Sequence, residues 1–156
     1  MIATLHTKAT FPATMDGVAA AAGWMRDLIE RELLGDKLAY ALELCLEELG
    51  TNVVRHGRPA ESRLSGTAPL AFTAAVTLED DGTAELTIED NGRPFDVSQE
   101  PGRPIRRPLS EVIPGGLGIQ LIRSFSDALL YEPVENGNRV IVKFLRQHES
   151  ASKAAV

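Results

Sequence analysis

The sequence predicts a single α/β domain, and three observations indicate it. The chain has 156 residues, of which 44% are hydrophobic and 24% charged, and this is enough apolar material for one core. Two long segments carry apolar residues at helical spacing. Two pairs of short alternating segments flank tight-turn sequences at 80–82 and 136–137, as expected of β-hairpins. We expect the domain to span residues 1–146 and residues 147–156 to fray, because this tail has little to pack against.

The first half of the chain reads as a strand followed by two helices. An alternating segment over residues 2–11 predicts the strand. Asp16 can cap the first helix, which we expect to reach about Leu34 before Gly35 stops it. The second helix is expected over Asp36–His56, with its aspartate as the cap. One face of this second helix carries the apolar residues Leu38, Leu42, Cys45, Leu46, Leu49 and Val53.

The second half of the chain predicts two hairpins separated by a loop and a short helix. In chain order we expect strands over 70–78 and 84–88, an irregular loop over 96–114, a helix over 118–125, and strands over 128–132 and 139–145. The loop holds four prolines, and between Arg93 and Leu109 there are four arginines against two acids. A loop of this length is typically a lid or a binding loop. It can cover an anionic ligand or contact a partner protein, and the sequence leaves both open.

Charge and cysteine content exclude several classes of protein. The net charge of -6 argues against nucleic acid as the main partner, because phosphate neutralisation needs a basic surface. Cys45 is the only cysteine, so an intrachain disulfide is impossible, and we interpret it as a small buried helix residue. No apolar run approaches the roughly 20 residues that span a bilayer, and the N-terminus has no signal-peptide pattern. We therefore expect a cytoplasmic protein that binds neither membrane nor nucleic acid.

Glu48 and Asn52 lie one turn apart on the second predicted helix, so their side chains project from the same side. At about 100° per residue they fall at the edge of the apolar face, where a pocket between helix and sheet would be lined. An asparagine oxygen is a hard, neutral ligand suited to Mg²⁺, and a carboxylate one turn away can act as a general base. The alternative is a solvated pair on a helix flank, which is common.

Asp90 ends a predicted strand and enters the sequence Asn91-Gly92. A carboxylate at this place can accept a hydrogen bond from the exocyclic amine of adenine, whereas guanine would present a second acceptor. Gly92 would let the backbone approach the base closely, and Phe95 would pack beneath the loop. An ordinary turn that closes a strand is the alternative, since Asp-Asn-Gly favours turns in any protein.

The segment Gly115-Gly116-Leu117-Gly118 leads into the short predicted helix. Its glycines permit unusual backbone angles, and free N–H groups in a first helical turn can bind phosphate oxygens. A dinucleotide-binding fingerprint is excluded, because Leu121 occupies the third glycine position and too little chain follows for a doubly wound sheet. A flexible hinge without a ligand remains an alternative.

Together and in this order, the three segments resemble the boxes of the GHKL ATPase superfamily. Glu48-x-x-x-Asn52 resembles the N box, Asp90-x-Gly92-x-x-Phe95 the first glycine box and Gly116-x-Gly118 the second. The small size of the chain, the His56-Gly57 pair and the run from Gly115 to Ile122 look like the bacterial anti-sigma factor serine/threonine kinases. The resemblance extends from the opening strand to about Leu145.

The resemblance implies a two-layer α/β sandwich of the Bergerat ATP-binding type, with a mixed, mostly antiparallel sheet and helices on one face. It implies a kinase that binds ATP and Mg²⁺, holds a sigma factor inactive and phosphorylates a STAS-type anti-anti-sigma protein, commonly as a homodimer. Carried over residue by residue, Glu48 is the base, Asn52 the Mg²⁺ ligand, and Asp90 with Gly92 the adenine contact. The segment 115–118 would hold the phosphates.

One residue departs from the family pattern. Many relatives have Gly-Thr before the final strand, where the threonine supports the adenine end, but here Asn138 follows Gly137. A nucleotide-regulated module that sequesters a partner with little catalysis is the alternative function. The catalytic domain of a histidine kinase is disfavoured, because the chain has no room for a dimerising helical hairpin with its phosphoacceptor. We interpret His56 as a helix-end or pocket-wall residue.

Overall fold

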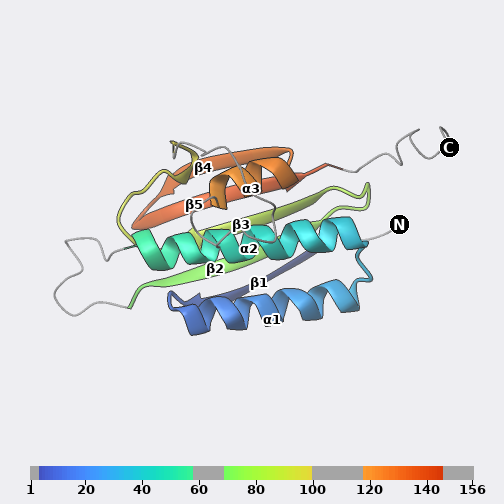
Figure 1. Cartoon of the computed structure of the whole chain (residues 1–156), viewed down its shortest axis with the longest axis horizontal. Coiled ribbons are helices and arrows are strands. Elements are labelled where there is room, and N and C mark those ends of the chain that lie inside the picture. The colour runs from blue at the N-terminus through green and yellow to red at the C-terminus, as the bar shows by residue number, and fades with distance from the viewer. Residues whose placement is uncertain (1–3, 58–68, 100–117, 146–156) are drawn as a thin grey trace, which may run out of the picture.

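The computed structural model describes residues 4–57, 69–99 and 118–145. Within these ranges the strands and helices follow one another in the order that the hydrophobic patterns predict (Figure 1). The elements in chain order are β1 (Leu5–Pro12), α1 (Met15–Arg31), α2 (Asp36–His56), β2 (Ala71–Leu78), β3 (Ala84–Asp90), the 3₁₀ helix η2 (Val97–Gln99), α3 (Gly118–Phe125), β4 (Ala128–Val134) and β5 (Gly137–Phe144).

The five strands form one sheet in the order β1-β2-β3-β5-β4, and the helices cover one of its faces (Figure 1). The predicted two-layer α/β sandwich is therefore confirmed. All four strand pairings in the described residues are antiparallel, whereas the resemblance implied a mixed sheet. The reason is that β5 turns back from the edge strand β4 and runs antiparallel to β3 as well, so these five strands contain no parallel crossover.

The core lies between the sheet and the helices. Alternate residues of the central strands are buried on the face toward the helices, which is the period-two pattern of a half-covered sheet. The largest side chains buried there are Phe72, Met25, Leu28, Leu42, Leu46, Leu86 and Ile88. The predicted apolar face of α2 is confirmed, with Leu38 packed against the core and the other five residues buried. Burial, aided by the nearby Glu48 carboxylate, raises the pKa of the Cys45 thiol to about 12.

The predicted N-caps are wrong by one or two residues and the predicted end of the first helix by about three, although the helices themselves are confirmed. The N-cap of α1 is Thr14, whose side chain accepts a hydrogen bond from the N–H of Gly17 at 3.0 Å, and Asp16 lies inside the first turn. α1 ends at Arg31 rather than near residue 34, because Leu33 adopts a left-handed φ of 52° where the chain turns toward α2. Asp36 is the first residue of α2, after an N-cap at position 35.

The two predicted hairpins and the short helix are confirmed. Residues 79–83 connect β2 to β3, and Asp81 accepts a hydrogen bond from the N–H of Thr83 at 2.8 Å. Residues 135 and 136 connect β4 to β5, with Asn136 at a φ of 64°. The helix α3 has the predicted bounds. Most of the predicted loop over 96–114 and the predicted tail lie outside the described residues.

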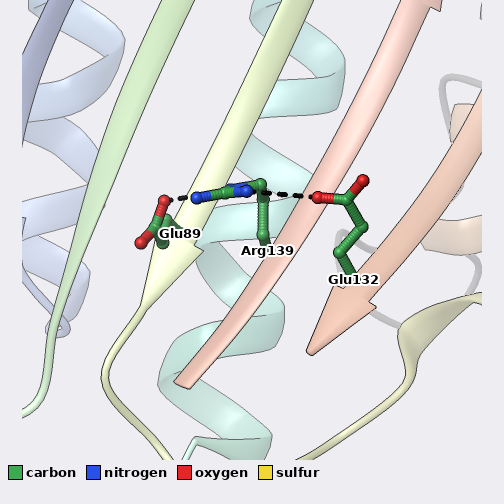
Figure 2. A network of polar contacts seen from close by, with 3 residues as sticks. All are labelled: Glu89, Glu132 and Arg139. Atoms are coloured by element: carbon green, nitrogen blue, oxygen red, sulfur yellow. Dashed lines mark hydrogen bonds and ion pairs between the residues drawn. The ribbon is translucent and has the colours of Figure 1, made fainter. Parts of the chain in front are cut away.

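The face of the sheet away from the helices carries polar side chains. Figure 2 shows Arg139 of β5 between Glu89 of β3 and Glu132 of β4, in front of the strands and with the helices behind. The guanidinium lies 3.2 Å from Glu89 and 3.1 Å from Glu132. These side chains are partly exposed, so we expect the ion pairs to contribute little to stability.

None of the helices in the described parts of the chain is long and apolar enough to cross a membrane.

Candidate active site

A cavity of about 30 Å³ lies between α2, the ends of β3 and β5, and the loop after β3. Its lining combines apolar walls with a few polar groups, the usual composition of a ligand site. The apolar walls come from Leu49, Val53, Ile88, Phe95, Val97 and Val140. The polar or charged residues of the lining are Asn52, Asp90, Arg93 and Asn138.

Asp90 is the carboxylate of this cavity. It ends β3 on the face toward the helices, and its Oδ1 accepts hydrogen bonds from the N–H of Gly92 at 2.9 Å and from Nδ2 of Asn138 at 3.0 Å. Burial raises the pKa of Asp90 above its usual value, and the neighbouring Glu89 acts in the same direction, while the two hydrogen bonds act against both. The site therefore holds an acid whose charge is costly and is stabilised by two fixed donors.

Asn138 is the centre of the hydrogen bonding at this end of the site. It is 3% exposed and lies directly opposite Asp90 in the pairing of β3 with β5. Its Nδ2 donates to Asp90 and to the carbonyl oxygen of Arg93 at 2.8 Å. Its Oδ1 accepts from the N–H of Phe95 at 2.9 Å and from the hydroxyl of Tyr131 at 2.6 Å. Every hydrogen-bonding position of the carboxamide is thus used.

A glycine brings the strand of Asn138 close to Asp90. A Cβ at Gly137 would collide with the carbonyl oxygen of Asp90 and lie 3.2 Å from the Cα of Asn91. Only glycine therefore allows β5 to begin this near to the end of β3. The close approach lets the side chain at position 138 reach the loop that follows β3.

Glu48 lies where α2 meets α3. It is 3% exposed, and a Cβ at Gly118, the first residue of α3, would collide with its Oε2. The predicted base, Glu48, therefore lies against Gly118, the last glycine of the predicted phosphate segment. Those two residues are 70 positions apart in the sequence, so their contact is a product of the fold.

Asn52 follows Glu48 by one turn of α2 and lines the same cavity as Asp90. The structure therefore places one predicted site residue of the N box beside the predicted adenine contact. Within the described ranges, no group of three His, Cys, Asp or Glu side chains could hold a metal. Asn52, whose side-chain oxygen is the predicted Mg²⁺ ligand, lines this cavity.

The loop after β3 is held by a ring contact with the end of α2 and by hydrogen bonds at the start of β2. Phe95 stacks on His56 at the end of α2, with ring centroids 4.9 Å apart and an angle of 12° between the planes. His56 is thus a helix-end residue beside the pocket, as predicted. Asn91 connects the loop to the start of β2, since it accepts from the N–H of Ala71 at 2.9 Å and donates to the carbonyl oxygen of Pro69 at 3.1 Å.

Sequence reasoning found part of this site and missed its centre. Of the predicted residues, Asn52 and Asp90 line the cavity and Gly92 is hydrogen-bonded to Asp90, whereas Glu48 and Gly118 lie against each other where α2 meets α3. Gly115, Gly116 and Leu117 lie outside the described residues. The bonding of Asn138 and Tyr131 was not predicted. The available signal was a polar side chain at an inward-facing position of a strand, which needs partners when it is buried.

Comparisons with known proteins bear on the family and the fold. The sequence model of the family described as histidine kinase-like ATPase domain matches residues 11–144. The serine/threonine-protein kinase BtrW of Bordetella bronchiseptica is 31% identical over 121 residues, which are 75% of this chain and 78% of that protein. The crystal structure of the RsbU and RsbW domains of Rv1364c from Mycobacterium tuberculosis is similar with a TM-score of 0.61 at 14% identity. That match covers 92% of this chain and spans 32% of the other, and it supports the fold.

Proposed function

The chain belongs to the histidine kinase-like ATPase domain family, and on this premise we propose that it is an ATP-dependent protein serine/threonine kinase. The substrate of the kinase in this proposal is a STAS-type anti-anti-sigma protein. The kinase also acts as an anti-sigma factor that holds a sigma factor inactive. Residues 1–146 form the catalytic domain. We further propose that the protein works in the cytoplasm as a homodimer.

The contact of buried Glu48 with the start of α3 is the observation that carries the proposal. A module that only binds nucleotide has no need of a carboxylate beside its phosphate segment, whereas phosphoryl transfer to a hydroxyl needs a proton acceptor there. The similarity to a named serine/threonine kinase at 31% identity supports the same chemistry.

In the proposed reaction, the hydroxyl oxygen of the substrate serine or threonine attacks the γ-phosphorus of ATP. The bond from that phosphorus to the bridging oxygen breaks, ADP leaves, and the hydroxyl proton passes to the carboxylate of Glu48. Because Gly118 has no side chain, the carboxylate of Glu48 lies directly against the first turn of α3, whose N–H groups would bind phosphate oxygens in this proposal.

The other roles are assigned by the chemistry of the side chains. Oδ2 of Asp90 would accept from the amine of adenine, and the apolar walls of the cavity would contact the flat base. Asn52 would hold Mg²⁺ through its oxygen, and the bound ion neutralises charge on the phosphates.

The test is transfer of labelled phosphate from ATP to a STAS-domain protein, comparing wild type with Glu48→Gln. We expect transfer to fall by about 10²- to 10⁴-fold, the usual contribution of a general base, while calorimetry shows that ATP binding is retained. Glu47→Gln is the matched control, because Glu47 is the preceding residue of α2 and is exposed. It should transfer phosphate like the wild type.

The outcomes separate the possible functions. Undiminished transfer by Glu48→Gln would show that this carboxylate is not the base. ATP binding and a stable sigma factor complex, without phosphate on any STAS protein tried, would instead indicate a sequestering module regulated by nucleotide.

A further inference from the structure

Two backbone groups fix the direction of the Asn138 carboxamide. The N–H of Phe95 can only donate and the carbonyl oxygen of Arg93 can only accept, and they contact opposite ends of the carboxamide at 2.9 and 2.8 Å. A reversed carboxamide would place donor against donor and acceptor against acceptor. Nδ2 is therefore fixed on the side where Asp90 lies.

This fixed donor determines what Asp90 can offer to a ligand. Oδ1 of Asp90 faces two donors, Nδ2 of Asn138 at 3.0 Å and the N–H of Gly92 at 2.9 Å. A proton on Oδ1 would point at both of them, so Oδ1 remains an acceptor. Both hydrogen bonds found for Asp90 among the described residues go to Oδ1, and the residue lines the cavity. Oδ2 is thus the oxygen available to a ligand.

We propose that Asn138 is a positioning residue that sets the hydrogen-bonding polarity of Asp90 and thereby selects 6-amino over 6-oxo purines. The inference rests on the proposed function, because it assumes that Asp90 reads the base. An ionised Oδ2 can accept from a 6-amino group, whereas a 6-oxo group would present a second acceptor to it. The selection depends on the donor that Asn138 supplies.

The same two donors would orient a carboxamide placed at position 90. In Asp90→Asn, the side-chain oxygen would turn toward Asn138 and Gly92, and the NH₂ group would point into the cavity. The ligand would then meet a donor in place of an acceptor. A 6-oxo purine fits this donor, so the preference for the base should reverse and not merely weaken.

The experiment is calorimetric titration of the full chain with ATP and with inosine triphosphate, both with Mg²⁺. The inosine base carries an oxo group at position 6 and a hydrogen on the adjacent N1 and lacks the 2-amino group of guanine, so the comparison is confined to the edge formed by position 6 and N1. We expect the wild type to prefer ATP and Asp90→Asn to prefer inosine triphosphate. Asp127→Asn is the matched control, because the side chain of Asp127 accepts from the N–H of Leu145 at 2.7 Å, and an amide oxygen can do the same. Its preference should match the wild type.

A second variant removes the donor itself. Asn138→Asp keeps an acceptor for Phe95 and Tyr131 but presents an oxygen to Asp90 and Arg93, which both offer acceptors. We expect the preference for ATP over inosine triphosphate to fall by about tenfold or more, equivalent to about 1.4 kcal/mol. If this variant does not fold, Asp90→Asn still keeps the inference falsifiable, because a continued preference for ATP in that variant would show that the donors of Asn138 and Gly92 do not set the polarity of the site.

Each outcome has one meaning. Absence of binding by the wild type would overturn the nucleotide site and the inference together. Equal binding of both nucleotides by the wild type would overturn base reading by Asp90 and leave a nucleotide site. An Asp90→Asn variant that still prefers ATP would overturn the role of Asn138 and leave the proposed function intact. An Asn138→Asp variant that loses both affinities by the same factor would show a purely structural residue and overturn the inference.

Discussion

The last two residues of β3 carry carboxylates that lie on opposite faces of the sheet and differ in their surroundings. Asp90 faces the helices and lies opposite the carboxamide of Asn138. Glu89 faces the open side and lies opposite Arg139, with which it forms an ion pair (Figure 2). Two neighbouring residues of β3, each paired with a neighbouring residue of β5, therefore belong to different environments. Asp90 lies in a half-buried site, and Glu89 lies in an exposed network of ion pairs.

The difference lies in what each partner leaves available. Arginine carries a positive charge and several donors, so it neutralises Glu89 and binds its oxygen. The neutral carboxamide of Asn138 supplies one hydrogen bond to Asp90 and leaves its other oxygen to the cavity. A neutral, fixed donor thus leaves an acid more able to accept a hydrogen bond from a ligand than an ion pair does.

The largest effect is expected on the helix side, at the contact of Glu48 with Gly118. In Gly118→Ala the new Cβ would collide with Oε2 of Glu48 and displace the carboxylate. We expect phosphoryl transfer to a STAS protein to fall by about 10²- to 10⁴-fold, as when a general base is lost. Labelled-phosphate transfer measures it.

The control for this change is another helical glycine. A Cβ at Gly23 of α1 would meet nothing within 4 Å, so Gly23→Ala should keep activity and raise stability by about 0.5–1 kcal/mol. Full transfer by Gly118→Ala would contradict the catalytic position of Glu48.

The two neighbouring carboxylates give the next effect. Asp90→Asn removes a charge-assisted hydrogen bond worth about 1.5–3 kcal/mol, so ATP binding should weaken roughly 10- to 150-fold. Glu89→Gln alters the adjacent acid on the open face and should leave the affinity unchanged. Calorimetry of both variants measures the difference in ATP affinity. An equal loss of affinity in the two variants would contradict the assignment of the nucleotide site to the helix side of the sheet.

A smaller effect concerns stability and pH. Because the pKa of Asp90 is raised in the folded protein, its contribution to stability is present below the unfolded pKa and is lost as the pH rises through the folded pKa. Asp90→Asn cannot ionise, so without nucleotide it should unfold at a higher temperature than the wild type near neutral pH. The difference in unfolding temperature between the variant and the wild type should become smaller toward about pH 4. Thermal unfolding across this range checks it, and a less stable variant at neutral pH would contradict the direction.

The smallest effect is expected on the open face. Arg139→Gln removes two partly exposed ion pairs, with Glu89 and Glu132, each worth about 0.2–1 kcal/mol. Denaturant unfolding should show a small loss of stability in the variant, and this loss should become smaller at higher salt concentration because salt screens the ion pairs in the wild type. ATP binding should not change. A weakened ATP affinity would show that the network on this face supports Asp90.

Local patterns predicted the elements of this fold well. The apolar spacing of α2 and the turn sequences of both hairpins depend on neighbouring residues, so the sequence alone carries them. Helix caps were less predictable, because both Thr14 and Asp16 suit an N-cap and only the path of the chain after β1 selects Thr14. The family was recognised from three separated motifs, and the match over residues 11–144 confirms it.

The organisation of the site could be predicted only in part. Glu48, Asn52 and Asp90 were predicted as site residues because their residue types suit the chemistry at those spacings. The four bonds of Asn138 join it to β3, the loop after β3 and β4, up to 48 positions away in the sequence. Such bonds depend on strand register and on the close approach at Gly137, which no local pattern contains.

The most direct test of the proposed site is calorimetric titration of the purified chain with ATP, with and without Mg²⁺, and then with GTP. We expect saturable ATP binding that Mg²⁺ strengthens, and no comparable binding of GTP. An absence of heat and of thermal stabilisation at millimolar ATP would contradict the nucleotide site formed around Asp90.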